Sequence, residues 1–109
     1  MGLDIEIKVQ KPIICPHCGK IAYFQTVDET NSSGGVWYDY LESIGYYVPY
    51  EKRTEENDWY GKDMRLTDEQ TSRLESYVKV NRMSGYYDIL GLIADAKTDG
   101  NVVTINADW

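Results

Sequence analysis

Leu3-Asp4-Ile5-Glu6-Ile7-Lys8-Val9 alternates an apolar with a charged side chain at each position. A period of two is typical of a strand with one buried face. Lys11-Pro12 is expected to end this strand, because proline cannot donate to a β-ladder. The tight turn Cys15-Pro16-His17-Cys18-Gly19 follows, and Ile21–Val27 reads as a second strand. These segments predict a hairpin with the cysteine turn at its tip.

The middle of the chain predicts one short helix and a long loop. Thr30–Gly35 (TNSSGG) consists of turn-forming residues. Trp37, Tyr40, Leu41 and Ile44 then recur at helical spacing, and Gly45 stands where a left-handed C-cap is expected. Residues 46–50 are expected to be extended and residues 51–64 to form a long polar loop.

The last third predicts two helices and a strand. Thr67-Asp68-Glu69-Gln70 is a capping box, and the helix that it starts should run to about Arg82. Ser84 is expected to cap the next helix, which ends at Asp99-Gly100, and Val102–Ile105 should be the last strand. The inward side chains expected on that second helix are Tyr86, Ile89, Leu90, Ile93 and Ala94.

These elements predict an α+β fold, with a small antiparallel sheet of about three strands and three helices on one face. The length of 109 residues is that of a single domain. Within it we distinguish the hairpin with its CPHCG tip (1–29), an aromatic-rich helix and loop (30–64), and two helices with the final strand (65–109).

Charge and composition restrict the partners. The net charge is −7, from 18 acidic and 11 basic residues, whereas nucleic-acid binding depends on basic residues. We therefore expect no direct nucleic-acid contact and a partner protein with a basic surface. No apolar run is long enough to span a bilayer, and residues 1–9 do not resemble a signal peptide, so the prediction is a cytoplasmic protein without membrane contact.

The CPHCG turn predicts Cys15 and Cys18 as metal ligands, but they form only half of a site. A structural zinc ion takes four ligands, and the sequence has no other cysteine and no histidine besides His17. A homodimer that pairs two turns, or weaker ligands, would complete the site. Two other interpretations stay open: a redox dithiol, and a turn that is purely architectural. The cofactor is accordingly either zinc or none.

Aromatic residues mark a second candidate site. The chain has ten tyrosines and three tryptophans but one phenylalanine, and many of these rings lie between Trp37 and Tyr60. Helical spacing places Trp37 and Tyr40 in the core. The Trp59-Tyr60 pair lies in a charged loop, where it either folds back over a small core or contacts a partner. We predict six partner-binding residues: Tyr38, Trp59, Tyr60, Glu55, Glu56 and Asp58.

The CPHCG turn, the run Gly45–Met64 (GYYVPYEKRTEENDWYGKDM) and the closing stretch Asn101–Trp109 (NVVTINADW) together carry a resemblance. The chain resembles small phage- and prophage-encoded proteins with a single CPxCG turn. Such accessory proteins include inhibitors of bacterial immune systems, which block effector proteins or sequester nucleotide signals. The resemblance brings no assigned functional residue with it.

The sequence thus predicts a non-enzymatic acidic binding protein that engages a host protein and inhibits a bacterial defence system. A first alternative is an oligomeric sponge for a nucleotide signal, with bases stacked on tyrosines and phosphates held by Arg53 or Arg65. A second alternative is a thiol-redox or zinc-binding protein that acts through the CPHC segment.

Overall fold

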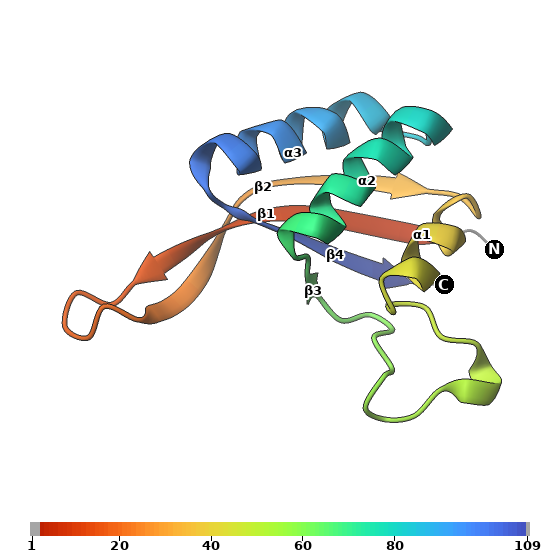
Figure 1. The fold of residues 1–109 in the computed structure, drawn as a ribbon, viewed down its shortest axis with the longest axis horizontal. Coiled ribbons are helices and arrows are strands. Elements are labelled where there is room, and N and C mark those ends of the chain that lie inside the picture. The colour runs from red at the N-terminus through yellow and green to blue at the C-terminus, as the bar shows by residue number, and fades with distance from the viewer. Residues whose placement is uncertain (1–2, 109) are drawn as a thin grey trace.

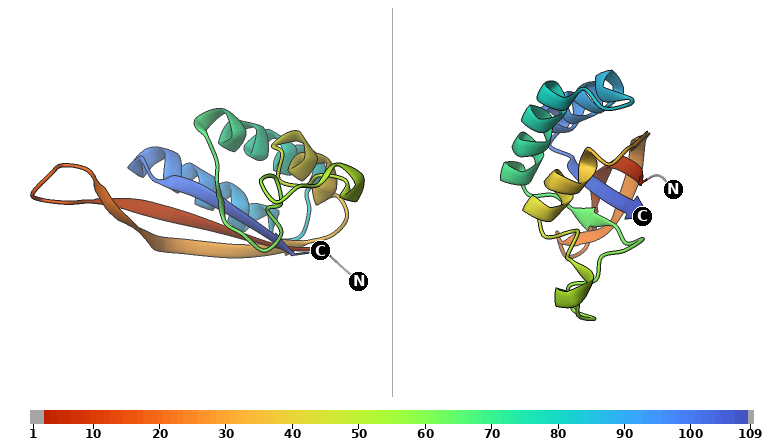
Figure 2. Two further views of the ribbon diagram at one scale, coloured as in Figure 1. Left: turned by 90° about the horizontal axis from the view of Figure 1, so that it is seen from below. Right: turned by 90° about the vertical axis from the view of Figure 1, so that its right-hand side faces the viewer.

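The computed structural model describes residues 3–108 and confirms the predicted α+β fold. Within these residues, three α-helices lie on one face of a four-stranded antiparallel sheet of order β2-β1-β4-β3 (Figures 1 and 2). The elements are β1 (Asp4–Ile14), β2 (Ile21–Ser33), α1 (Trp37–Ser43), the 3₁₀ turn η1 (Tyr50–Lys52), β3 (Met64–Arg65), α2 (Asp68–Asn81), α3 (Tyr86–Asp99) and β4 (Val102–Asp108).

The core lies between the sheet and the helices. The alternation in β1 buries Ile5, Ile7 and Val9, and their register partners Ala107, Ile105 and Val103 on β4 are buried as well. Helices α2 and α3 contribute the facing side chains, which include Leu74, Val78, Ile89, Leu92 and Ile93. Full burial of each such side chain contributes about 1.5–3 kcal/mol, so this layer holds the sheet and the helices together.

Both hairpin strands are longer than predicted. The expected end of the first strand at Lys11-Pro12 is wrong, because β1 continues to Ile14. Pro12 is tolerated there because β4 pairs with β1 only as far as Gln10, so one edge of β1 is open beyond that point. The expected loop over residues 30–35 is also wrong at its start, since residues 30–33 pair with the beginning of β1.

Helix α2 begins and ends as predicted. The Thr67 hydroxyl accepts from the Gln70 N–H (3.2 Å), and the Gln70 side chain accepts from the Thr67 N–H (2.9 Å). At the other end, Arg82 takes the left-handed conformation with φ of 47°. The predicted boundaries follow from local sequence because both caps are local interactions.

The beginning of α3 differs from the prediction. Gly85, with φ of 74°, is the N-cap residue, and the Ser84 hydroxyl accepts from the Ser33 N–H of β2 (3.1 Å) instead of capping the helix. A Cβ on residue 85 would lie 2.9 Å from the Asn31 carbonyl oxygen, so glycine lets the helix start close against β2. The buried face of α3 carries Leu92 and Ala96, whereas the predicted inward residue Ala94 is exposed.

The shortest strand was not predicted. Met64 and Arg65 of β3 pair with Ile105 and Thr104 on the outer side of β4. Two residues are too few to show an alternating pattern, so this segment reads as the end of the preceding loop. With β3 in place, β2 and β3 are the two outer strands of the sheet.

Candidate functional site

Two parts of the chain project from the helix-covered sheet. One is the loop of residues 44–63 between α1 and β3, called here the aromatic loop. The other is the end of the β1–β2 hairpin, residues 11–24, called here the arm, which extends past the last pairing of β1 with β4. They lie at opposite ends of the molecule, so they are separate candidate sites (Figure 1).

Tyr46 anchors the aromatic loop. Its side chain is 1% exposed, and its hydroxyl donates to the Lys62 carbonyl (2.6 Å) and accepts from the Ala107 N–H (2.8 Å). Burial raises the pKa of Tyr46, while the hydrogen bond that its hydroxyl accepts from the Ala107 N–H opposes the rise. The Gly61 N–H donates to the Ala107 carbonyl (3.0 Å), so the loop is fastened to β4 where β3 no longer pairs with it.

The sequence left open whether the Trp59-Tyr60 pair folds back over the core or contacts a partner, and the two residues differ in this respect. Trp59 is half-buried against the core, with its ring centroid 6.3 Å from that of Tyr46. Tyr60 is 45% exposed and donates its hydroxyl hydrogen bond to the Asp108 carboxylate, which raises the pKa of Tyr60. Trp59 therefore packs inward, while Tyr60 presents part of its ring to the outside.

The outer end of the aromatic loop is structured by its own hydrogen bonds. The Thr54 N–H donates to the Asn57 side chain (2.6 Å), and the Asn57 amide group donates to the Lys52 carbonyl (3.2 Å). The Arg53 guanidinium donates to the Val48 carbonyl (2.9 Å). Tyr50, at the start of η1, is 84% exposed, the largest value among the exposed large apolar side chains described. A ring is thus held outward on an ordered turn.

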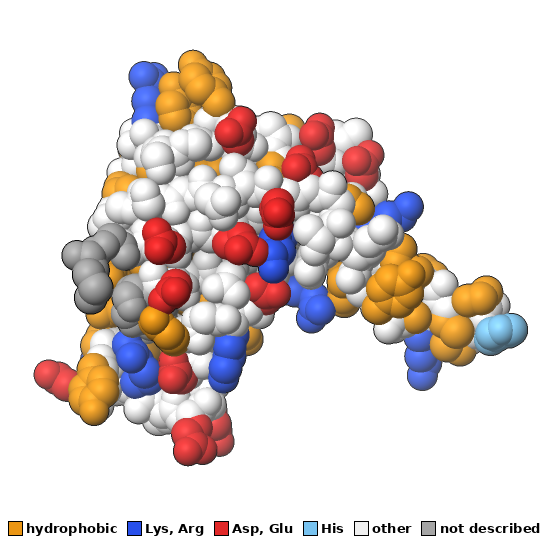
Figure 3. Space-filling model, turned by 180° about the vertical axis from the view of Figure 1, so that it is seen from behind, with side chains coloured by type: hydrophobic (Ala, Val, Ile, Leu, Met, Phe, Trp, Pro, Cys, Tyr) orange, Lys and Arg blue, Asp and Glu red, His pale blue; other side chains and the backbone are white. Residues whose placement is uncertain are grey.

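Three predicted acidic residues lie on this turn and after it. Glu55 and Glu56 are exposed, and Asp58 is half-buried, with its carboxylate accepting from the Tyr60 N–H (3.2 Å). Figure 3 shows acidic and apolar side chains beside one another on the loop, at the lower left, with basic side chains between them. The loop combines exposed rings with carboxylates.

Tyr38 is placed on α1 rather than in the loop. It is half-buried, and its ring meets that of Tyr47 edge to face at 5.0 Å between centroids. Tyr47 follows the anchor Tyr46, so Tyr38 borders the base of the loop. The six predicted binding residues therefore extend from this base to the outer turn. Tyr46, which anchors the loop, and the exposed Tyr50 were not predicted. Their only signal was membership of a tyrosine-rich run.

The CPHCG turn caps the arm. The Gly19 N–H donates to the Cys15 carbonyl (3.0 Å), the Cys15 N–H donates to the Lys20 carbonyl (2.8 Å), and both thiols are free. Hydrogen bonds from the backbone of His17, then from the backbone and the side chain of Cys18, lower the pKa of Cys15. The turn thus favours a thiolate at Cys15, as a metal ligand or a redox thiol requires.

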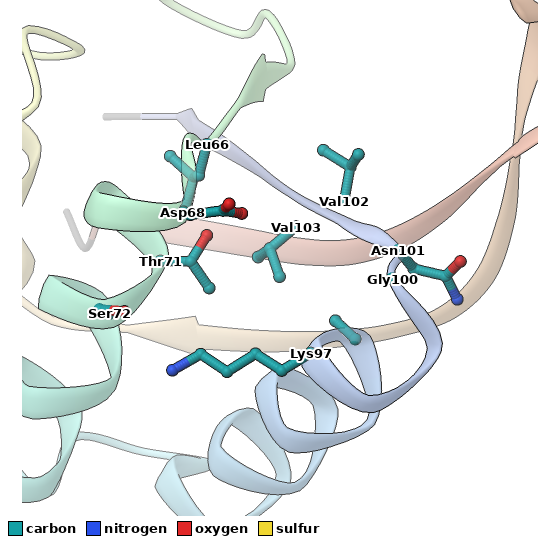
Figure 4. A pocket seen from close by; sticks show the side chains of 10 residues that line it. Leu66, Asp68, Thr71, Ser72, Lys97, Gly100, Asn101, Val102 and Val103 are labelled. Carbon is teal, nitrogen blue, oxygen red and sulfur yellow. The ribbon is translucent and has the colours of Figure 1, made fainter.

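A groove of about 500 Å³ lies between the start of α2, the end of α3 and β4 (Figure 4). Its charged side chains are Asp68 and Lys97, and the Lys97 ammonium group lies 3.5 Å from a carboxylate oxygen of Glu75. The other lining residues are Leu66, Thr71, Ser72, Ala96, Gly100, Asn101, Val102 and Val103. The Thr71 hydroxyl at this groove donates to the Thr67 carbonyl (2.9 Å).

The two arginines of the sponge hypothesis lie in different places. Arg53 contacts the loop backbone, as described above. The guanidinium carbon of Arg65 lies 3.9 Å from the ring centroid of Phe24, and this contact joins β3 to the arm. Both guanidinium groups therefore contact the chain itself.

Comparison of the chain with protein-family models, with curated proteins and with solved structures gives no significant match. Within residues 3–108, the structure has no helix that is long and apolar enough to cross a membrane.

Proposed function

We propose that this protein is a non-enzymatic binding protein that uses the aromatic loop to contact a partner protein with a basic surface. The observation that carries the proposal is that the loop is anchored by the buried Tyr46 yet holds Tyr50 and Tyr60 outward among carboxylates. An anchored loop loses little conformational entropy on binding, and exposed tyrosines are common anchors of protein interfaces.

Charge supports the choice of partner. The chain carries a net charge of −7, and Glu55 and Glu56 are exposed on the outer turn. Carboxylates at the rim of an interface speed the encounter with a basic surface, and they do so less at high salt. Tyr50 would then enter the contact centre, with Tyr60 and Tyr38 towards its edge and Trp59 supporting the loop from inside.

The resemblance to phage-encoded accessory proteins suggests the class of partner. We propose a host protein, in particular an effector of a bacterial defence system that would be blocked by the contact. This places the protein in the cytoplasm, where reduced Cys15 and Cys18 are also expected.

The test is capture of host proteins by the immobilised chain, followed by measurement of the dissociation constant with each purified candidate. Tyr50→Ala and the double variant Glu55→Gln/Glu56→Gln should each weaken binding about tenfold or more, as expected of an interface centre and of paired steering charges. The double variant Asp95→Asn/Asp99→Asn on α3 removes the same charge from exposed residues outside the loop.

The α3 double variant distinguishes a contact made by the loop from a general effect of net charge. Retention of affinity in the α3 double variant, with loss in the loop variants, supports the proposal. Equal loss in both double variants, or full binding by Tyr50→Ala, would show that the loop is not the contact surface. Thermal unfolding of each variant checks that the fold is intact.

A further inference from the structure

The two cysteines at the tip of the arm, Cys15 and Cys18, belong to one turn. The backbone hydrogen bonds from Gly19 to Cys15 and from Cys15 to Lys20 close the turn, and Gly19 takes φ of 71°. Cys15 and Cys18 are both free and stand two residues apart in this turn. Two cysteines at this spacing on one closed turn can bind a zinc ion from one side.

The turn supplies two ligands of the four that a structural zinc ion takes. The sequence has no further cysteine. Within residues 3–108, no group of three or more histidine, cysteine, aspartate or glutamate side chains is placed to hold a metal ion. Within these residues the turn thus supplies two of the four ligands, and a second molecule would supply the other two.

The arm presents the turn where a second molecule can reach it. It extends past the last β1–β4 pair, Gln10 with Val102, and stands clear of the helices (Figures 1 and 2). The molecule measures 45 Å along its longest axis and 23 Å along its shortest. Two copies can therefore meet tip to tip about a twofold axis with their helical layers kept apart.

The arm also carries apolar surface next to the turn. Three of the nine exposed large apolar side chains described for residues 3–108 belong to the arm, and each is between 52 and 59% exposed. They are Ile14, Ile21 and Tyr23. Figure 3 shows apolar side chains along the arm and His17, the pale blue group, at its end. Ile14 and Ile21 are register partners, so they lie on the same face of the arm.

We propose that two copies of this chain join at their arms through one shared zinc ion, held by Cys15 and Cys18 of each copy. Four Zn–S bonds form, and each thiol releases its proton to solvent. The apolar side chains beside the turns, Ile14 and Ile21 first, are then buried between the two arms. This proposal goes beyond the binding function of the aromatic loop and does not rest on it.

The test is a zinc titration of the reduced, metal-free protein, followed by native mass spectrometry and analytical ultracentrifugation. We expect a dimer that contains one zinc ion for two chains and that returns to monomer when a chelator removes the metal. Cobalt(II) in place of zinc should give the absorption bands of a tetrahedral tetrathiolate site.

Substitutions distinguish the two proposed zinc ligands from the other residues of the turn. Cys15→Ser and Cys18→Ser should each abolish zinc-dependent dimerisation with an unchanged circular dichroism spectrum, because the arm lies outside the core. His17→Ala, in the same turn, should keep the stoichiometry and the cobalt spectrum.

Several results would overturn the proposal: one zinc ion bound per monomer, no zinc binding, a dimer that survives chelation, or loss of the site in His17→Ala. A dimer that only a reductant dissociates would show a disulfide instead. Ile14→Ser should keep the metal stoichiometry and raise the dimer dissociation constant about tenfold, as expected when an apolar contact is lost at both copies. An unchanged constant would overturn the packing of the two arms.

Discussion

β3 pairs with Ile105 and Thr104 of β4 but does not reach Ala107, whose N–H donates to the Tyr46 hydroxyl instead. Replacement of Tyr46 by phenylalanine tests how much this hydroxyl stabilises the protein. The ring and its contact with Trp59 are kept, but the Ala107 N–H loses its acceptor and the Lys62 carbonyl loses a donor. A buried polar group left without a partner costs about 1–3 kcal/mol. The Ala107 bond is buried, whereas the Lys62 bond is only partly buried.

We therefore expect a loss of about 2 kcal/mol in the free energy of unfolding, nearly all from the Ala107 N–H. For a domain of this size, that loss lowers the melting temperature by about 8 °C or more. Urea denaturation gives the free energy, and amide hydrogen exchange should show faster exchange at Ala107 and in the adjoining loop.

Tyr50→Phe is the matched control, because it removes the hydroxyl of a residue that is 84% exposed. Its stability should change by less than about 0.5 kcal/mol. The reasoning is refuted if Tyr46→Phe is as stable as the unsubstituted protein, or if both variants lose the same free energy.

Three further predictions concern the body of the protein. Thr67→Ala removes the hydroxyl that accepts from the Gln70 N–H and should cost about 1 kcal/mol in urea denaturation. Gly85→Ala should cost more, about 2 kcal/mol or above, because residue 85 has positive φ and its new Cβ would meet the Asn31 carbonyl at 2.9 Å. Burial raises the pKa of Tyr40 above its ordinary value of 10, so the stabilisation from its neutral phenol is complete below pH 10 and is lost as the pH rises above it. Tyr40→Phe should make the alkaline loss of stability, followed by circular dichroism, less steep.

Local patterns predicted most of the architecture. The alternation from Leu3 to Val9 and the capping box at Thr67 depend on nearby residues, and both are confirmed. The predicted end of the first strand at Lys11-Pro12 was wrong because Pro12 is tolerated only if β4 begins at Val102, ninety residues later, and leaves that edge of β1 open. The prediction that Ser84 caps α3 was wrong for a related reason, because the Ser84 hydroxyl accepts from the Ser33 N–H of β2 instead.

The candidate sites were predictable in outline only. A tyrosine-rich charged run identifies the aromatic loop, but the sequence does not distinguish the buried Tyr46 from the exposed Tyr50. That difference arises from the short β3, which leaves Ala107 of β4 to be paired by the loop. In the same way, CPHCG identifies the turn, and only the extended β1 and β2 show how far it stands from the core.

Because β2 is an edge strand, its outer side determines whether further copies can add to the sheet. An unpaired strand edge invites another chain to add to the sheet, and repeated addition would produce a filament. Along this edge, Asp28 and Glu29 are exposed, and an incoming antiparallel copy would bring its own carboxylates into the same zone. Repulsion between these carboxylates opposes the addition of a further strand at β2, so the sheet does not continue into a second molecule.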